Sequence, residues 1–342
     1  MQKDLISIVI PCFNTAKFLP DCFASLDNQT YQKFEVFFVN DGSTDNTLDV
    51  LKQYCQNKPN CKIVNQPNSG VSTARNAGLA CANGEFVYFY DSDDVLLPNM
   101  LEELLHNLKH IDADVSVCGF KYVAENFKPK FKPCKVFGKV HTFKQEDAIC
   151  HLFSGRLLRT SIWNKLFKHN IIKKIDGYPN VFSAQIKYGE DTEFNFKYLE
   201  HSNKTVFCGA KLYCYRQRQG SVVHSKFNEN MLTNFFGISN IINSCEGKFP
   251  KAQKYAQSWQ GLASIATLFY IFKSDYSDKN VILQLQNQLK RNMPNIVFGA
   301  KNALLFRIFA PLGYIVFKVA LCARTKNSAT KIKLRSAPNL TN

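Results

Sequence analysis

The first 120 residues alternate short apolar runs with segments whose apolar residues recur at helical spacing. The apolar runs are rich in β-branched and aromatic residues, which is typical of buried strands. Strands are expected at 5–10, 34–39, 62–64, 86–90 and 115–120, and helices between them at 17–29, 47–55, 71–81 and 101–109. This alternation predicts an α/β fold, a Rossmann-like and mostly parallel sheet flanked by helices.

Polar residues follow three of these strands at the point where each strand ends. The first strand runs into Pro-Cys-Phe-Asn at 11–14, the second into Asn-Asp-Gly-Ser at 40–43, and the fourth into Asp-Ser-Asp-Asp at 91–94. In sheets of this kind, ligands bind at the carboxyl ends of the strands. We therefore expect the three polar clusters to meet on one edge of the sheet and to form a binding site.

The acidic cluster after the fourth strand contains Asp91, Asp93 and Asp94. Carboxylates packed this closely repel one another unless a cation or hydrogen-bond donors compensate. Hard carboxylate oxygens suit Mg²⁺ or Mn²⁺. A solvated acidic turn is the simpler alternative for an isolated D-x-D, but the position after a very apolar strand favours a metal site.

Other charged groups at strand ends and helix starts could act on a ligand. Asp41 ends the second strand and could accept a hydrogen bond from a base edge, or only stabilise its turn. Arg75 lies on the helix of the small-residue run 68–78 and could reach a phosphate or base, or lie on the surface. Glu190 and Asp191 open a helix, where the dipole favours acids, and could supply a general base.

A basic loop follows the last expected strand. Arg216 and Ser221 lie in Tyr-Arg-Gln-Arg-Gln-Gly-Ser at 215–221, and His224 follows closely. An arginine, a glycine turn and a serine can together hold a diphosphate, although a generic basic loop is the alternative. Lys165, in Trp-Asn-Lys at 163–165, could be a surface lysine beside a packed tryptophan.

Beyond residue 120 the strand–helix pattern loosens. Residues 121–144 are basic and contain proline, so a loop or hairpin is expected there. Helical or partly helical segments are expected at 145–153, 163–167 and 189–199, and strands at 206–207 and 211–215. Residues 226–300 also look helical.

Positive charge is concentrated at the end of the chain. The net charge is +16 over 342 residues, and from Lys279 onward there are eleven Lys or Arg and no acid. A basic tail needs an anionic partner such as lipid, nucleic acid or an acidic substrate. The apolar segment 303–323 is broken by Arg307, Pro311 and Lys318. This favours an amphipathic helix on an anionic membrane over a spanning helix, with a helix packed on the protein as the alternative.

The cysteines and the N-terminus indicate a compartment. The 12 cysteines include no C-x-x-C pair, which argues against a zinc ribbon or a thioredoxin-type site. Met1 is followed directly by a short apolar run, so no secretory signal is expected. We predict a cytoplasmic protein with free thiols, peripheral on the inner face of the cytoplasmic membrane.

Seven motifs occur in an order that points to a family. They are SIVIPCFN (7–14), VNDGSTD (39–45), NSGVSTARNAGL (68–79), FVYFYDSDD (86–94), SIWNKLF (161–167), GEDTEF (189–194) and YRQRQGS (215–221). This set resembles the family 2 glycosyltransferases with the GT-A fold, and looks closest to bacterial members that build polysaccharide or lipopolysaccharide glycans. The resemblance implies a GT-A catalytic domain over 1–225, followed by a helical, basic region over 226–342.

The resemblance also implies a reaction and roles for residues. The reaction is an inverting, metal-dependent transfer of a hexosyl or N-acetylhexosaminyl group from a nucleotide-diphosphate donor, expected to be a UDP-sugar, to a hydroxyl of a glycan or lipid-linked acceptor. Asp191 matches the catalytic base, Asp93 the ligand of Mn²⁺ or Mg²⁺, and Asp91 a residue near the ribose or the metal's water shell. The donor-binding set is Pro11, Phe13, Asp41, Arg75, Asp91, Arg216 and Ser221. Further candidates in or beside the same motifs are Asp94, Glu190, Lys165 and His224. One departure is Asn40, where the family often has an additional Asp.

Three other functions fit the sequence less well. A nucleic-acid-binding protein would need a basic face with stacking aromatics, but the charge lies in the tail and the acidic strand end would repel phosphate. A nucleotidyltransferase would need a Gly-rich loop after the first strand, where this chain has Pro-Cys-Phe-Asn. A catalytically silent relative acting as a scaffold is disfavoured because Asp93 and Asp191 are both present.

Overall fold

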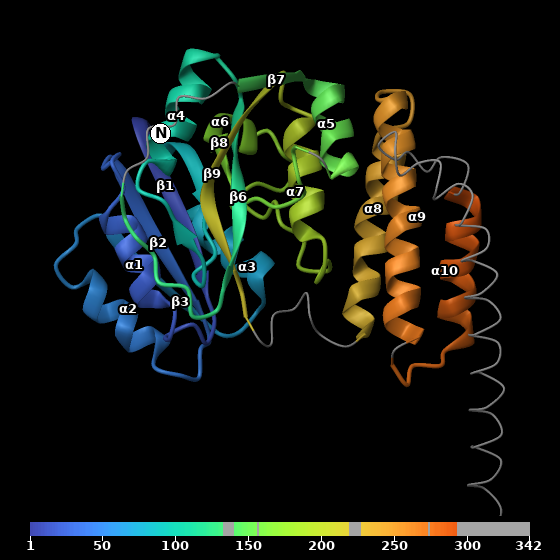
Figure 1. Ribbon diagram of the computed structural model, residues 1–342, viewed down its shortest axis with the longest axis horizontal. Helices are drawn as coiled ribbons and strands as arrows, with labels where there is room; N and C mark the ends of the chain where they lie inside the picture. The colour runs from blue at the N-terminus through green and yellow to red at the C-terminus, as the bar shows by residue number, and fades with distance from the viewer. Residues whose placement is uncertain (133–139, 156, 219–226, 273, 293–342) are drawn as a thin grey trace, which may run out of the picture.

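The computed structural model describes residues 1–132, 140–155, 157–218, 227–272 and 274–292. Its body is a nine-stranded sheet with helices on both faces, and three helices stand in a row beside that body (Figure 1). The strand order is β3-β2-β1-β4-β8-β6-β9-β5, with β7 paired to β9. Most paired residues lie in the parallel pairs, which confirms the expected α/β fold with a mostly parallel sheet.

The strands are β1 (Gln2–Cys12), β2 (Phe34–Asp41), β3 (Cys61–Gln66), β4 (Gly84–Phe89), β5 (Val95–Leu96), β6 (Val115–Ala124), β7 (Val140–Lys144), β8 (Lys165–Lys168) and β9 (Lys204–Gln217). The helices are α1 (Leu19–Asp27), α2 (Thr47–Cys55), α3 (Val71–Ala80), α4 (Met100–His110), α5 (Gln145–Ser154), α6 (His169–Ile172), α7 (Glu190–Leu199), the 3₁₀ turn η2 (Glu229–Leu232), α8 (Thr233–Ser244), α9 (Pro250–Phe272) and α10 (Lys279–Asn292).

Strand β1 shows why the sheet is buried on both faces. Successive strand residues point to opposite faces, and Ile8 and Ile10 belong to the core beneath α1 and α4, whereas Val9 belongs to the core beneath α3 and α5–α7. Helix α3 lies very close to the sheet at Gly78, where a Cβ atom would be 2.4 Å from Val9 Cγ1. Glycine at this position therefore lets α3 hold Arg75, one turn earlier, against the edge of the sheet.

One expectation for the region beyond residue 120 was wrong. The run 163–167 was expected to be helical, but it leads into β8, an inner strand hydrogen-bonded to both β4 and β6. A short apolar run is compatible with either structure, and here the pairing with two neighbours decides for the strand. The strands expected at 206–207 and 211–215 are confirmed, and both belong to one strand, β9, whose pairing with β6 shifts register near Gly119.

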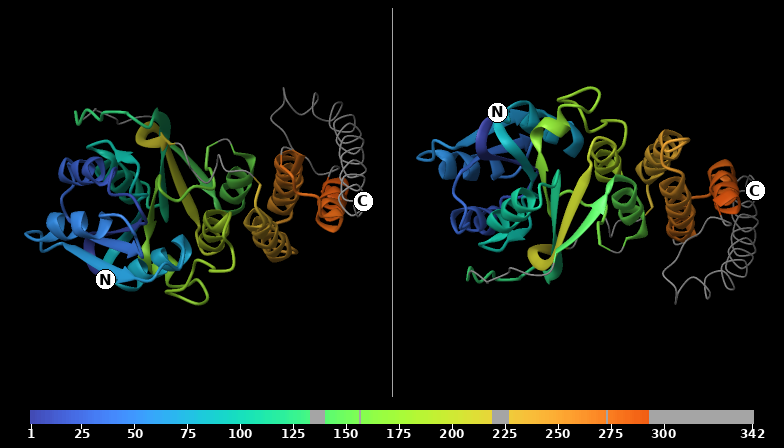
Figure 2. Two further views of the ribbon diagram at one scale, coloured as in Figure 1. Left: turned by 90° about the horizontal axis from the view of Figure 1, so that it is seen from below. Right: turned by 90° about the horizontal axis from the view of Figure 1, so that it is seen from above.

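The C-terminal part that the structure describes is helical. Helix α9 packs against α5, α8 and α10, and Figure 2 shows the three long helices on the side of the body that carries α5 and α7. They share a small apolar core that includes Phe235, Leu268 and Leu285. No helix among the described residues is long and apolar enough to cross a membrane. The expected amphipathic segment 303–323 lies outside the described residues.

Candidate functional site

The polar clusters after β1, β2 and β4 lie together at one edge of the sheet. Strand β1 pairs in parallel with both β2 and β4, so the three strands end side by side. The backbone N–H of Asn14 donates to Ser43 Oγ over 3.1 Å, joining the first two loops. Pro11 is half-buried within β1, and Phe13, just beyond it, exposes 47% of its surface. The loops after these three strands therefore present backbone turns and the open ring of Phe13.

Asp41 is buried under the loop that leads into α3. Its Oδ1 atom accepts hydrogen bonds from Gln66 Nε2 at 2.7 Å and from the N–H of Ser69 at 2.9 Å, and its Oδ2 atom accepts one from the N–H of Gly70 at 2.9 Å. Gly70 has a φ of 89°, a conformation that favours glycine. The carboxylate thus fixes the loop that begins α3, and its contact with a nucleotide base stays a prediction.

Arg75 connects three carboxylates from two segments that are far apart in the sequence. Its Nη1 atom lies 2.7 Å from Asp191 Oδ1 and 2.9 Å from Glu190 Oε1, and its Nη2 atom lies 3.3 Å from Asp91 Oδ1. Only 3% of the arginine is exposed. Helix α3 brings Arg75, α7 brings Glu190 and Asp191 in its first turn, and the end of β4 brings Asp91. We refer to these four residues as the Arg75 cluster.

The Arg75 cluster has an excess of acid. Three carboxylates face one guanidinium, and among the described residues the buried Nε atom of Arg75 has no hydrogen-bond partner. Burial raises the pKa of Asp191 to about 7, opposed by the positive charge of Arg75. Burial likewise raises the pKa of Asp91 to about 6, again opposed by Arg75. A carboxylate with a pKa near neutrality in a partly open site is suited to accept a proton.

Asp93 pairs with an arginine that the motifs did not single out. Its Oδ2 atom lies 2.5 Å from Arg218 Nε, and the two side chains expose 18% and 32% of their surfaces. Arg218 follows the end of β9, two residues after the arginine that the sequence favoured. The only signal for Arg218 was its place in the same basic loop. In this structure the guanidinium of Arg218 lies beside Asp93, where the carboxylate would also stabilise a metal ion.

Arg216 is enclosed by the protein instead of facing the edge. Its Nη2 atom lies 2.7 Å from Asp21 Oδ2, and its Nε and Nη1 atoms donate to the backbone carbonyls of Asp93, Glu125 and Phe127. Only 3% of its surface is exposed. These contacts give all three nitrogen atoms of the guanidinium a partner, so the described arrangement gives Arg216 a structural role, and its predicted contact with a diphosphate stays untested.

Asp94 is turned inward from the acidic loop. Its Oδ2 atom accepts the hydroxyl hydrogen of Tyr213 at 2.5 Å, and its Oδ1 atom accepts the N–H of Arg216 at 2.6 Å. Burial raises the pKa of Asp94 well above its usual value. Asp94 therefore ties the acidic loop to β9. Two other predicted residues, Ser221 and His224, lie outside the described residues.

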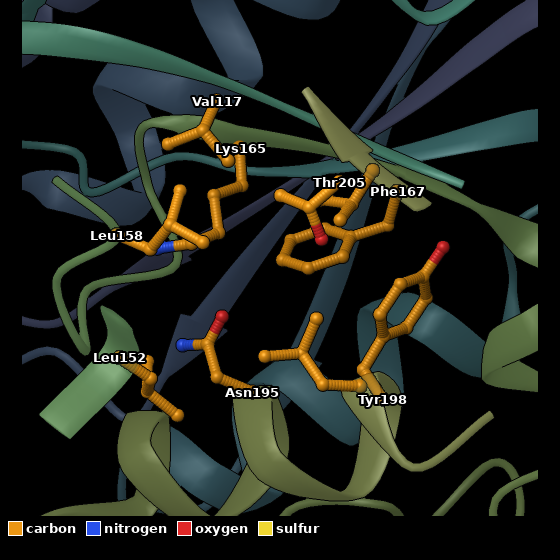
Figure 3. Close-up of a pocket in the computed structure, with 10 residues that line it drawn as sticks. Val117, Leu152, Leu158, Lys165, Phe167, Asn195, Tyr198 and Thr205 are labelled. Carbon is orange, nitrogen blue, oxygen red and sulfur yellow. The ribbon is translucent and has the colours of Figure 1, made fainter. Parts of the chain in front are cut away.

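Lys165 is buried, although the sequence suggested a surface lysine. It is 4% exposed, and its Nζ atom donates to the carbonyl of Arg159 at 2.7 Å and to that of Ser161. Burial lowers the pKa of Lys165 to about 7, although the nearby Asp191 favours the charged form. Figure 3 shows the side chain lining a small cavity beside Leu158.

Asn195 of α7 reaches the same loop as Lys165 (Figure 3). Its Nδ2 atom donates to the carbonyls of Thr160 at 2.7 Å and of Asp191 at 2.8 Å. One amide group thus bridges the 157–162 loop and the first turn of α7. This bridge, together with Lys165, fixes the backbone from which Asp191 projects.

The acidic loop has suitable oxygen ligands for a metal bound together with a substrate. Among the described residues, no three His, Cys, Asp or Glu side chains are placed to hold a metal by themselves. Mg²⁺ and similar ions, however, are usually held by one or two carboxylates together with substrate phosphates. Asp93, with Asp91 beside it at the strand end, provides such a pair. The residues therefore fit a cation that binds with a diphosphate.

Comparison with known proteins identifies the family of this chain. The model of the family "Glycosyl transferase family 2" matches residues 7–175. The glycosyltransferase GlyG of Streptococcus pneumoniae is 30% identical over 66% of this chain and 75% of its own length. The uncharacterized glycosyltransferase EpsJ of Bacillus subtilis is 25% identical over 66% of this chain and 65% of its own length. This chain therefore spans just under two thirds of EpsJ.

Solved structures share the fold. The structure of S. aureus TarS 1-349 in complex with UDP-GlcNAc superposes with a TM-score of 0.64 and 21% identity, covering 96% of this chain and 91% of that one. The mannosyltransferase PcManGT from Pyrobaculum calidifontis, in complex with GDP-Man and Mn²⁺, gives a TM-score of 0.52 and 15% identity over 97% and 88% of the two chains. At these identities the comparison shows the GT-A-like fold alone.

Proposed function

This chain belongs to glycosyltransferase family 2, and from that premise we propose that it transfers a sugar from a nucleotide-diphosphate donor to an acceptor hydroxyl with inversion at the anomeric carbon. The observation that carries this proposal is the Arg75 cluster. It places a carboxylate of raised pKa, Asp191, beside the strand ends where a nucleotide sugar would bind. The acceptor we propose is a glycan or a lipid-linked glycan in the synthesis of cell-surface polysaccharide or lipopolysaccharide.

A UDP-sugar is the donor that the comparisons favour. TarS, which has the same fold, was crystallised with UDP-GlcNAc, whereas PcManGT was crystallised with GDP-Man. We propose that the open ring of Phe13 and the turn at Asp41, which lie at the strand ends, contact the nucleoside. We propose an N-acetylhexosaminyl or hexosyl group as the sugar that is transferred.

Asp191 would act as the general base. Its carboxylate takes the proton from the acceptor hydroxyl as that oxygen attacks the anomeric carbon, and the bond between that carbon and the diphosphate breaks with its electron pair on the leaving phosphate. A single displacement inverts the anomeric centre and needs only one base. Arg75 holds the Asp191 carboxylate through its Nη1 atom, which fixes the direction in which the base can accept a proton.

A divalent cation would assist departure of the diphosphate. Asp93, with Asp91, is the pair we propose to hold Mn²⁺ or Mg²⁺, which when bound neutralises charge on the leaving group. Since Arg218 pairs with Asp93 in the described structure, binding of the cation would release this arginine. The guanidinium could then face the diphosphate oxygens, a role that the motifs assigned to Arg216.

The basic end of the chain favours a location at the membrane. Eleven Lys or Arg and no acid follow residue 278, and such a segment is attracted to anionic lipid. We propose a peripheral position on the inner face of the cytoplasmic membrane, where a lipid-linked acceptor would be found. Nucleic acid is not a proposed partner.

The test of the proposed function is release of free nucleoside diphosphate from a panel of nucleotide sugars with Mn²⁺. We expect turnover of one UDP-sugar by the wild type, and loss of that turnover with EDTA, in Asp93→Ala and in Asp191→Asn. Detergent-solubilised lipid-linked acceptors would be added if acceptor-free hydrolysis is too slow to detect. If no donor is turned over under either condition, and calorimetry detects no nucleotide binding, the enzyme function is wrong.

A further inference from the structure

An aromatic patch covers the same edge of the sheet as the Arg75 cluster. It consists of Phe120 and Tyr122 from β6, Tyr215 from β9, and Trp163 from the loop before β8. Strand β6 runs parallel to β9, and both run parallel to β4 because β8 is antiparallel to β4 and to β6. The carboxyl ends of β6 and β9 therefore lie at the edge that carries the acidic loop.

Three rings of the patch are at least partly exposed, and Trp163 lies beneath them with 7% of its surface exposed. Tyr122 stands opposite Tyr215 in the strand pairing, with ring centroids 5.8 Å apart, and it exposes 56% of its surface. Phe120 packs edge-on against Trp163 at 4.9 Å, and both Phe120 and Tyr215 are partly exposed. Rings fixed by strands and by one another lose little conformational freedom when a ligand binds.

The patch is joined to both halves of the reaction site. On the donor side, Trp163 stacks on Tyr213 at 4.2 Å, and Tyr213 donates its hydroxyl hydrogen to Asp94 of the acidic loop. On the other side, the guanidinium of Arg159 lies 5.0 Å from the ring centre of Phe120. The residue after Arg159 is Thr160. The amide nitrogen of Asn195 donates both to the carbonyl of Thr160 and to the carbonyl of Asp191. The patch thus adjoins the donor loop and the backbone that holds the base.

We propose that this aromatic patch binds a pyranose ring of the acceptor glycan. A pyranose has an apolar C–H face and a rim of hydroxyls, so one face can cover an aromatic ring while the rim meets polar groups. Tyr122 and Tyr215 provide rings with hydroxyls, and Arg159 provides guanidinium donors beside Phe120. A tyrosine-rich surface that these contacts link to the acidic loop and to the backbone of Asp191 fits a sugar better than a lipid chain, which would bind aliphatic side chains equally well. This assignment rests on the proposed glycosyl transfer and names its acceptor.

The binding test uses Trp163 as its own reporter. The chain has two tryptophans, so Trp259→Phe leaves Trp163 alone in the emission spectrum. This variant is titrated with chitobiose, cellobiose, lactose and maltose, and separately with phosphatidylglycerol vesicles. We expect at least one disaccharide to change the emission, the change to be lost when Tyr122→Ala is added, and Tyr122→Phe to restore it. A response to vesicles alone, a silent sugar panel, or a response that Tyr122→Ala leaves intact would overturn the proposal.

The activity test separates this inference from the proposed function. For the disaccharide that binds best, transfer and acceptor-free donor hydrolysis are measured in the same preparations. The ratio of transfer to hydrolysis should fall about tenfold in Tyr122→Ala, the size of effect expected for losing an aromatic anchor. The control is Phe236→Ala on α8, an aromatic of similar exposure (54%) far along the chain, which should leave the ratio unchanged. Absence of both hydrolysis and transfer in the wild type, together with no nucleotide binding, would contradict the proposed function, whereas turnover with an unchanged ratio would contradict only the acceptor site.

Discussion

Arg75 and Arg216 are both buried, with 3% of each residue exposed, but their partners differ. Arg75 faces three carboxylates, and among the described residues its Nε atom lacks a hydrogen-bond partner. Arg216 faces one carboxylate, that of Asp21, and three backbone carbonyls, so each nitrogen atom of its guanidinium has a partner. Excess acid around an incompletely paired cation is typical of a reaction site, and complete pairing is typical of a structural contact. Substitutions around the two arginines should therefore have different consequences.

The largest effect is expected in the Arg75 cluster. Asp191→Asn removes the proton acceptor but keeps the shape of the side chain, so transfer should fall about 10²–10⁴-fold. The free energy of unfolding should stay within about 1 kcal/mol, because one of three carboxylates competing for Arg75 is neutralised. Initial rates and urea denaturation measure the two quantities. If Asp191→Asn stays active, another group is the base. Glu190→Gln, measured beside it, tests whether that group is Glu190.

Arg216→Met should lower the free energy of unfolding more than it changes the KM for the donor. It leaves the Asp21 carboxylate and three carbonyls without their donor, which should lower the free energy of unfolding by about 3 kcal/mol. Thermal and urea denaturation of this variant, beside Arg218→Met, measure the difference. If Arg216→Met unfolds like the wild type but has a much higher KM for the donor, Arg216 contacts the diphosphate as its motif suggested, and the comparison between the two arginines fails.

The pH dependence follows from the raised pKa of Asp191. The base must be ionised to accept a proton, so kcat/KM should rise with pH through about 7 and fall about tenfold per pH unit below it. The profile is measured with the donor at low concentration and with a metal that stays bound across the range. A profile that is flat between roughly pH 5.5 and 8 would mean that Asp191 is ionised throughout or is not the base.

The smallest effect is expected when Arg218 is removed from its pair with Asp93. The two side chains are partly exposed, and exposed ion pairs contribute about 0.2–1 kcal/mol. Arg218→Gln should therefore lower the Mn²⁺ concentration needed for half-maximal activity about two- to fivefold, since the cation no longer competes with the guanidinium. Asp93→Asn should raise that concentration strongly. An unchanged requirement for Mn²⁺ in both variants would place the metal elsewhere.

The sequence predicted the parts of the site that depend on local pattern. Because ligands bind at strand ends, the pattern of apolar runs and polar turns was enough to bring Phe13, Asp41 and Asp91 to one edge. Helix α2 was expected at its observed bounds. Strand β8 was missed because a short apolar run does not distinguish an inner strand from a helix until its neighbours are known.

Contacts between distant segments could not be predicted in the same way. Arg75 and Asp191 are 116 residues apart, and no spacing rule pairs α3 with the first turn of α7. Likewise, the motif at the end of β9 contains two arginines. Only the structure shows that Arg216 faces the interior and that Arg218 lies beyond the end of the strand. Burial of Lys165 depends in the same way on the carbonyls that the 157–162 loop presents to it.

The most direct test of the central claim is the configuration of the sugar released from the donor. The Arg75 cluster offers one base, so water or an acceptor should displace the diphosphate once and invert the anomeric carbon. Proton NMR of early hydrolysis of the UDP-α-sugar that the donor panel identifies, by the wild-type protein with Mn²⁺, reads this configuration before mutarotation. We predict that the β anomer appears first and that Asp191→Asn abolishes its formation. First appearance of the α anomer would require two displacements and would contradict the role given to Asp191.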